Sequence, residues 1–254
     1  MPTIKERLKD GQRTLGCWLG LFNPIAAEIV ALSGYDCVVI DMEHGAGSYL
    51  EAIPLLQAIK GTSCAPLARV PSNEPVSIKK TLDLGVEGII IPNVSSVAEA
   101  EEALRSCRYP PQGIRGNAAG LVRASDYGLR AEDYQKTAND DLLVILQIES
   151  AEGLENVEAI AGVPGVDMLF IGPSDLSSTI GHHGDPGHGE VAEAIARIER
   201  AAASAGVHIG SILLRGRSAA SMARDGYALV VADSDITLLR RGGCQSVEAF
   251  RSDS

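Results

Sequence analysis

Short apolar runs alternate with amphipathic stretches along the whole chain, and this alternation is what most constrains the fold. The amphipathic stretches are predicted helices, and many end in glycine, the usual residue just past a helix. The apolar runs are predicted strands, covering residues 14–20, 37–42, 65–70, 88–92, 142–148, 168–171, 208–213 and 228–232. Strands that are apolar throughout are typical of parallel sheets buried on both faces. The pattern predicts an α/β fold, a (β/α)8 TIM barrel, and strand number alone leaves an open doubly wound sheet as the alternative.

The length of the chain is consistent with a single barrel domain over residues 1–254. Barrels reach 254 residues as one unit, and the 45% of hydrophobic residues supplies a large core. No shift in composition marks a second domain. The longest irregular stretch is 108–129, RYPPQGIRGNAAGLVRASDYGL, and a loop of that length in a compact fold is usually functional.

Charge and cysteine content limit the partners and the compartment. A net charge of −11 argues against nucleic acid and against anionic membrane surfaces, because both require clustered Lys and Arg. The five cysteines are odd in number and contain no C-x-x-C pair, which favours reduced thiols in the cytosol. The first twelve residues lack the apolar core of a signal peptide, and no apolar run is long enough to span a membrane. We therefore expect a soluble, cytoplasmic protein with a small-molecule substrate.

Polar side chains appear repeatedly where the apolar runs stop. In a barrel the active site lies at the carboxyl ends of the strands, so these side chains are expected to converge on one face. The residues concerned are Asp41, Glu43, His44, Arg69, Gln147, Glu149, Gly172, Ser174 and Asp175.

Glu149 and Asp175 follow consecutive strands and should be neighbours. Two carboxylates in that position repel each other unless a cation lies between them, and oxygen ligands favour Mg²⁺ or Mn²⁺. Gln147 lies on the same face of its strand as Glu149. The alternative is that each carboxylate caps a helix or pairs with a surface cation, but the two together with Gln147 favour a metal.

Arg69 and His44 are the candidate catalytic side chains. The Arg69 guanidinium can bind a carboxylate or a developing enolate oxygen, or it can form an ion pair with Asp41 or Glu43. His44, oriented by Asp41 three residues earlier, can act as a general acid or base, although a structural histidine is the commoner case.

Two glycine-containing segments offer weaker signals. In GPSD, the main-chain N–H groups of Ser174 and Asp175 can hold an anion, although Ser-Asp before a helix is also an ordinary cap. The segment HHGDPGH holds His182, His183 and His188 among glycine and proline, off any strand end. We interpret that segment as a solvated loop rather than a metal site.

The motifs together resemble those of the HpcH/HpaI aldolase family, the class II pyruvate aldolases, which includes 4-hydroxy-2-oxoheptanedioate and 2-dehydro-3-deoxygalactarate aldolases. The resemblance covers almost the whole chain. It runs through LGCWLGL, DMEH, PLARVP, LDLG, IPNV, RYPPQGIRG, LQIES, GVDMLFIGPSDLS and HGEV. The combination RYPPxGxRG, QIE and FIGPxDLS, in that order, is highly specific.

The resemblance implies a barrel of the phosphoenolpyruvate/pyruvate superfamily and a role for each matching residue. Glu149 and Asp175 would hold a divalent metal, Mg²⁺ or Mn²⁺ with Co²⁺ as a further candidate. The implied substrate-binding residues are Trp18, Arg69, Gln147, Gly172, Ser174 and Asp175. Within this set Arg69 would bind the pyruvyl carbonyl oxygen, Gln147 would support the water shell of the metal, and the N–H groups of Ser174 and Asp175 would hold the pyruvate carboxylate.

The resemblance also implies an acid/base dyad of His44 and Asp41, joined by Asp83 from a neighbouring subunit. Such subunits form homohexamers with an exchanged C-terminal helix, here DITLLRRGGCQSVEAF at 235–250. Three segments depart from the family pattern: DMEHGAGSYLEA, RGNAAGLVRAS with Asn117, and SILLRGRSAA. They border the aldehyde end of the pocket, so the natural aldehyde stays open.

The implied activity is cleavage of 4-hydroxy-2-oxo acids to pyruvate, or hydroxypyruvate, and an aldehyde through an enolate. The base that takes the methyl proton is left open between His44 and a hydroxide. A Schiff-base mechanism is not indicated, because no lysine ends an apolar strand. The alternatives are a lyase or decarboxylase for another 2-oxo acid such as oxaloacetate, and a non-enzymatic metabolite-binding barrel. The intact set of catalytic residues argues against the second.

Overall fold

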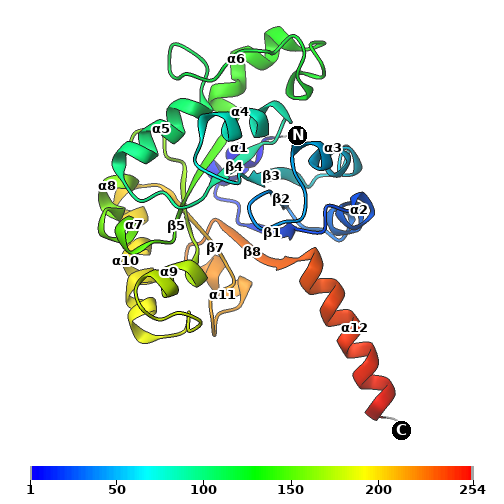
Figure 1. Ribbon diagram of the computed structural model, residues 1–254, viewed down its shortest axis with the longest axis vertical. Coiled ribbons are helices and arrows are strands. Elements are labelled where there is room, and N and C mark those ends of the chain that lie inside the picture. The colour runs from blue at the N-terminus through cyan, green and yellow to red at the C-terminus, as the bar shows by residue number, and fades with distance from the viewer. Residues whose placement is uncertain (1, 253–254) are drawn as a thin grey trace.

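Eight parallel strands form a closed barrel in the computed structural model, which describes residues 2–252 (Figure 1). The strands are β1 (Thr14–Leu19), β2 (Cys37–Asp41), β3 (Ala65–Arg69), β4 (Gly88–Ile91), β5 (Leu143–Ile148), β6 (Met168–Ile171), β7 (His208–Ile212) and β8 (Leu229–Ser234). All eight predicted strands are confirmed to within two residues. Because β8 pairs with β1, the open sheet is excluded. Met1 and residues 253–254, the ends of the predicted domain, lie outside the described residues.

Helices connect the strands and surround the barrel. They are α1 (Ile4–Lys9), α2 (Pro24–Leu32), α3 (Tyr49–Ala58), α4 (Pro75–Asp83), α5 (Val97–Cys107), α6 (Ala131–Asp141), α7 (Ala151–Glu155), α8 (Val157–Ala161), α9 (Pro173–Thr179), α10 (Gly189–Ala205), α11 (Ala219–Arg224) and α12 (Asp235–Ser252). Local sequence starts them: Asn23 accepts hydrogen bonds from the N–H groups of Ile25 and Ala26 at the beginning of α2. None of these helices has both the length and the apolar content needed to cross a membrane.

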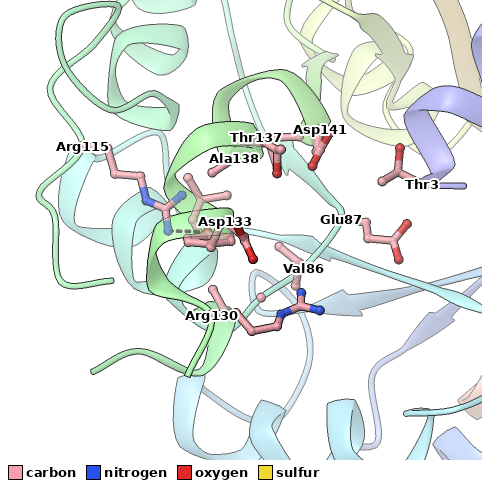
Figure 2. A pocket seen from close by; sticks show the side chains of 14 residues that line it. Thr3, Val86, Glu87, Arg115, Arg130, Asp133, Thr137, Ala138 and Asp141 are labelled. Carbon is pink, nitrogen blue, oxygen red and sulfur yellow. Dashed lines mark hydrogen bonds between the residues drawn. The ribbon is translucent and has the colours of Figure 1, made fainter. Parts of the chain in front are cut away.

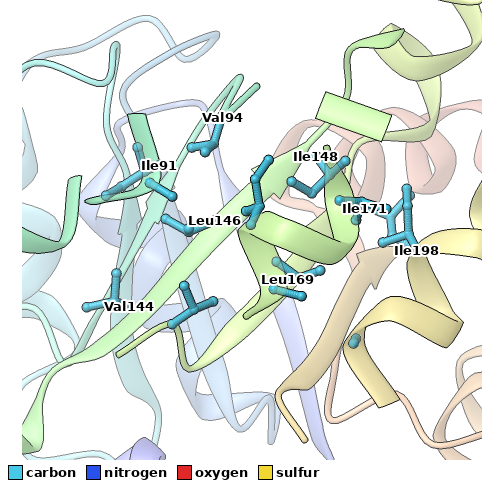
Figure 3. Packing of buried hydrophobic residues seen from close by; sticks show 14 of the residues in the cluster. Ile91, Val94, Val144, Leu146, Ile148, Leu169, Ile171 and Ile198 are labelled. Carbon is cyan, nitrogen blue, oxygen red and sulfur yellow. The ribbon is translucent and has the colours of Figure 1, made fainter. Parts of the chain in front are cut away.

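Side chains alternate between the interior of the barrel and the layer under the helices. On β5, Val144, Leu146 and Ile148 point outward, where they pack with Leu169 and Ile171 of β6 (Figure 3). The intervening side chains of β5 join the inner cluster of the barrel. Each strand is therefore buried on both faces, which explains why the strands read as continuous apolar runs.

Helix α1 closes the amino-terminal end of the barrel. Ile4 and Leu8 are buried in the same cluster as the inward-facing strand residues. The Ile4 N–H donates to Glu87 Oε2 (2.9 Å), just before β4, and Lys5 Nζ donates to the carbonyl of Leu142 (2.9 Å), just before β5. With this end covered, the barrel opens at the carboxyl ends of its strands.

Two segments lie outside the repeating pattern. The predicted irregular stretch 108–129 contains only the short 3-10 helix η1 (Arg123–Ser125), so that prediction is confirmed. Helix α12 projects away from the barrel (Figure 1), and its first residue, Asp235, accepts hydrogen bonds from the N–H groups of Gly20 (3.0 Å) and Leu21 (3.1 Å). Four of the five cysteines are buried, Cys244 is exposed, and all five are free thiols.

Candidate active site

A cleft of about 350 Å³ opens at the carboxyl ends of the strands, where the sequence predicts the site. It is lined by residues of seven strands, all except β4, and of the loops that follow them. Among them are Trp18, Asp41, His44, Arg69, Gln147, Glu149, Gly172, Ser174 and Asp175. Of the predicted site residues, only Asp83 does not line this cleft.

Glu149 lies just past the end of β5 and is 6% exposed. Its Oε1 accepts a hydrogen bond from the N–H of Asn93 (2.8 Å), and its Oε2 accepts one from Gln147 Nε2. Burial raises the pKa of Glu149, and the negative charges of Glu43 and Asp175 add to the shift, whereas the two hydrogen bonds oppose it. The carboxylate is thus held in place in a setting that disfavours its charge.

Gly172 allows this close approach of β6 to Glu149. A Cβ at Gly172 would lie 2.5 Å from Glu149 Oε2 and 2.9 Å from Gln147 Nε2, so any side chain there displaces the carboxylate. The following residues enter α9, and the exposed Asp175 belongs to its first turn. Glycine at this position is therefore required by packing at the site.

Glu149 and Asp175 have no cationic partner among residues 2–252. Neither forms an ion pair in this part of the chain, and the negative charge of Asp175 raises the pKa of both Glu43 and Glu149. Beside them, Gln147 Oε1 is buried without a hydrogen-bond partner in the described part of the chain. Two carboxylates and one unpaired amide oxygen are the donor set that a hard divalent cation takes, so these residues fit a metal.

Arg69, at the end of β3, is surrounded by negative charge. Its Nε and Nη2 donate to the two oxygens of Asp41 (3.0 and 2.8 Å), and its Nη1 lies 3.0 Å from Glu43 Oε2. The Trp18 ring lies 4.6 Å from the guanidinium carbon. The ion pair that the sequence offered as one interpretation of Arg69 is therefore present, and the same guanidinium lines the cleft.

Asp41 does not orient the His44 imidazole, contrary to the sequence interpretation. Its carboxylate is occupied by the Arg69 guanidinium and by the main-chain N–H groups of Glu43 (3.2 Å) and His44 (3.3 Å). The His44 side chain is 66% exposed, and its nearest carboxylate is that of Glu43, 4.0 Å from Nε2. Asp41 thus fixes the turn that carries His44 and leaves the ring free.

The sequence analysis named Glu43 only as one of two alternative ion-pair partners of Arg69, and the structure shows that contact. Burial raises its pKa, while the nearby charges of Arg69 and His44 lower it. Glu43 lies in the turn that follows β2, where strand alternation does not place a side chain, and its contact with Arg69 brings it to the site.

Asp83 belongs to a different region of the chain. It ends α4, and its Oδ1 accepts a hydrogen bond from Arg115 Nη2 (2.9 Å). Arg115 is 3% exposed, and it lines a second pocket beside α6, which also contains Glu87 and Asp133 (Figure 2). Glu87 precedes β4, so this pocket lies toward the closed end of the barrel. The contribution of Asp83 to a neighbouring subunit stays a prediction.

Known proteins resemble this chain both in sequence and in fold. A family model described as HpcH/HpaI aldolase/citrate lyase matches residues 14–241. The chain is 40% identical to 5-keto-4-deoxy-D-glucarate aldolase of Shigella boydii, over 98% of this chain and 96% of the relative. It is 38% identical to hydroxypyruvate/pyruvate aldolase of Chromohalobacter salexigens, over 95% of each.

Among solved structures, an HpcH/HpaI aldolase/citrate lyase family protein from Burkholderia cenocepacia superposes with a TM-score of 0.91 at 39% identity, covering 98% of both chains. Sequence and fold thus agree with these proteins over nearly the full length of the chain. The chain belongs to the HpcH/HpaI aldolase/citrate lyase family, and it is a lyase.

Proposed function

We propose that this lyase is a divalent-metal-dependent aldolase that reversibly cleaves 4-hydroxy-2-oxo acids to pyruvate, or hydroxypyruvate, and an aldehyde. The observation that carries the proposal is the pair Glu149 and Asp175, which faces the cleft without any cation from the described chain. The names of the two relatives, which specify a keto-deoxy sugar acid and hydroxypyruvate or pyruvate, support this class of substrate.

Glu149 and Asp175 would hold the metal, with Gln147 Oε1 beside them. Oxygen donors favour Mg²⁺ or Mn²⁺, and Co²⁺ is also compatible. A divalent cation bound there supplies Lewis-acid polarisation of the 2-oxo group of the substrate.

Arg69 would stabilise the negative charge that develops on the 2-oxo oxygen as the enolate forms. Asp41 takes its Nε and one Nη2 proton, and Glu43 faces Nη1, so one N–H on each terminal nitrogen stays available to the cleft. Because Asp41 holds the guanidinium through two bonds, this donor is preorganised and needs no reorientation during the reaction.

The substrate carboxylate would lie at the start of α9. Pro173 occupies the first helical position, and the N–H groups of Ser174 and Asp175 have no hydrogen-bond acceptor within residues 2–252. Gly172 leaves this edge of the cleft free of side-chain atoms. These amides are suited to hold a carboxylate.

His44 would handle the proton at the aldehyde end. In cleavage it accepts the proton of the 4-hydroxyl group, the C3–C4 bond breaks, and the aldehyde leaves while the electron pair forms the enolate of pyruvate. The enolate is then protonated at C3. An exposed imidazole suits this outer position.

The assembly of the protein belongs to the same proposal. Helix α12 extends from the barrel and exposes Ile236, Leu239 and Val247 at 49%, 70% and 49%. An amphipathic helix with such a face is stable when a partner covers it. We expect α12 to exchange with a neighbouring subunit in a homohexamer. Light scattering should give the mass of six chains for the full-length protein. A chain truncated before α12 should give a smaller mass.

Chelation tests the proposed function directly. Pyruvate release from 4-hydroxy-2-oxo acids should be lost in EDTA and restored by Mg²⁺, Mn²⁺ or Co²⁺. Full activity after exhaustive chelation, or covalent trapping of the enzyme with pyruvate and borohydride, would contradict the metal mechanism. A screen of pyruvate and hydroxypyruvate against aldehydes would then define the acceptor.

A further inference from the structure

A second group of potential metal ligands lies between α9 and α10, outside the cleft. His182, His188 and Glu190 place one ligand atom each within 4.8 Å of the others. His182 Nε2 lies 3.0 Å from Glu190 Oε2, and the two imidazole rings are stacked with their centroids 3.6 Å apart. The sequence interpretation of this segment as a dispersed, solvated loop did not include such a cluster.

The backbone holds these three residues together. The His182 N–H donates to the carbonyl of Ser177 (2.7 Å), the Asp185 N–H donates to the carbonyl of His182 (2.9 Å), and the His188 N–H donates to the carbonyl of Asp185 (3.1 Å). The loop is also tied to the segment after β7 by an ion pair between Asp185 and Arg215 (2.9 Å). The backbone that carries the ligands is therefore fixed before any ion arrives, and only side-chain rotation is left to complete the site.

We propose that His182, His188 and Glu190 form a second metal site, selective for borderline transition ions such as Zn²⁺ or Ni²⁺. Imidazole nitrogen suits these ions, whereas Mg²⁺ prefers oxygen. Two histidines and one glutamate are a known zinc ligand set that leaves a position for water. The proposed ligands in the cleft, Glu149, Asp175 and Gln147, are all oxygen donors, so the two sites differ in the ion that they select.

Small side-chain movements complete the site. An ion replaces the proton shared by His182 and Glu190, whose 3.0 Å separation is close to that of two ligands on one ion with bonds of about 2.1 Å. His188 turns out of the stack, because an ion must lie in the plane of each ring that binds it. His188 then gives up the bond that its Nδ1 accepts from the Glu190 N–H (3.2 Å).

Zinc titration of the full-length chain tests this site independently of the proposed catalysis. The background is Glu149→Gln/Asp175→Asn/Cys244→Ser, which removes the cleft ligands and the exposed thiol. Calorimetry with Zn²⁺ alone should give one ion per chain, and Mg²⁺ should give no binding. The affinity should fall as the pH is lowered, because protons compete with the ion for the imidazole nitrogens.

Single changes in that background separate the cluster from the rest of the surface. His182→Ala and Glu190→Gln should each weaken Zn²⁺ binding by more than about tenfold. His183→Ala is the matched control, because His183 is exposed and adjacent but outside the cluster, and it should leave binding unchanged. Absence of zinc binding in the background, or equal affinities of His182→Ala and His183→Ala, would overturn the proposal.

Discussion

Two pairs of carboxylates face the same cleft, and they differ in what balances their charge. Asp41 and Glu43 share the guanidinium of Arg69, at 2.8 and 3.0 Å. Glu149 and Asp175 have no cation in the described chain. The first pair completes an internal ion cluster. In the second pair Glu149 is a buried charge without a partner, which is costly, and Asp175 is exposed beside it, so this pair is suited to bind an added cation. The first pair therefore positions a catalytic group, the Arg69 guanidinium, and the second pair is expected to bind a ligand.

The largest effect is expected from changes to Glu149 and Asp175, the two carboxylates without a cationic partner in the described chain. Asp175→Ala and Glu149→Ala should abolish Mg²⁺ binding and lower aldol cleavage by at least about 10³-fold, since electrostatic stabilisation of the enolate is lost. Circular dichroism should show an intact fold, because catalytic-rim residues contribute little to stability. Unchanged Mg²⁺ affinity in both variants by calorimetry would contradict the assignment.

The ion cluster of Asp41, Glu43 and Arg69 predicts that Arg69 and His44 act in different steps of the reaction. Arg69→Ala should lower both deuterium exchange into pyruvate and aldol cleavage by about 10²–10³-fold, because one preorganised donor to the enolate is missing. His44→Ala should keep measurable exchange while cleavage is slowed. NMR on the two variants reads both rates. Equal loss of exchange in the two would make His44 the primary base.

The variant Asp41→Asn tests the same difference between the roles of Arg69 and His44. Since Asp41 contacts Arg69 and not the imidazole, its loss should lower deuterium exchange in the way that Arg69→Ala does. It should also destabilise the fold by roughly 3 kcal/mol, because it breaks a buried ion pair. Denaturant unfolding and the exchange assay measure the two effects. A variant with normal exchange but slow cleavage would instead support an Asp41–His44 dyad.

These partner choices mark the limit of what the sequence could predict. Strand positions follow from apolar patterning and from residues at strand ends, so the barrel, the cleft and the Glu149–Asp175 pair were predictable. The sequence offered both Arg69 and His44 as partners of Asp41, and the choice between them depends on register, because β2 and β3 align so that Asp41 pairs with Arg69. The His182 cluster depends on the folding of a loop, for which no periodic pattern exists.

The smallest expected effect is the pH dependence of stability without metal. The pKa of Glu149 is raised by burial, so the folded state binds its proton more tightly than the unfolded state. Its contribution to stability is therefore unfavourable at neutral pH and improves as pH falls toward its raised pKa. In EDTA, wild-type protein should gain stability relative to Glu149→Gln between pH 7 and 5. If the stability of the wild type relative to Glu149→Gln instead falls as the pH is lowered, the charge of Glu149 is balanced by a cationic side chain of the protein.

Thermal unfolding of the wild type, Glu149→Gln and Asp41→Asn, each in EDTA and in Mg²⁺, tests the central claim most directly. In EDTA, Glu149→Gln should unfold at or above the wild-type temperature, because an unbalanced buried charge is removed, whereas Asp41→Asn should unfold below it. Mg²⁺ should raise the midpoint of the wild type and of Asp41→Asn but not that of Glu149→Gln. If Glu149→Gln is destabilised in EDTA as Asp41→Asn is, and Mg²⁺ leaves the wild type unchanged, the two pairs of carboxylates do not differ as described.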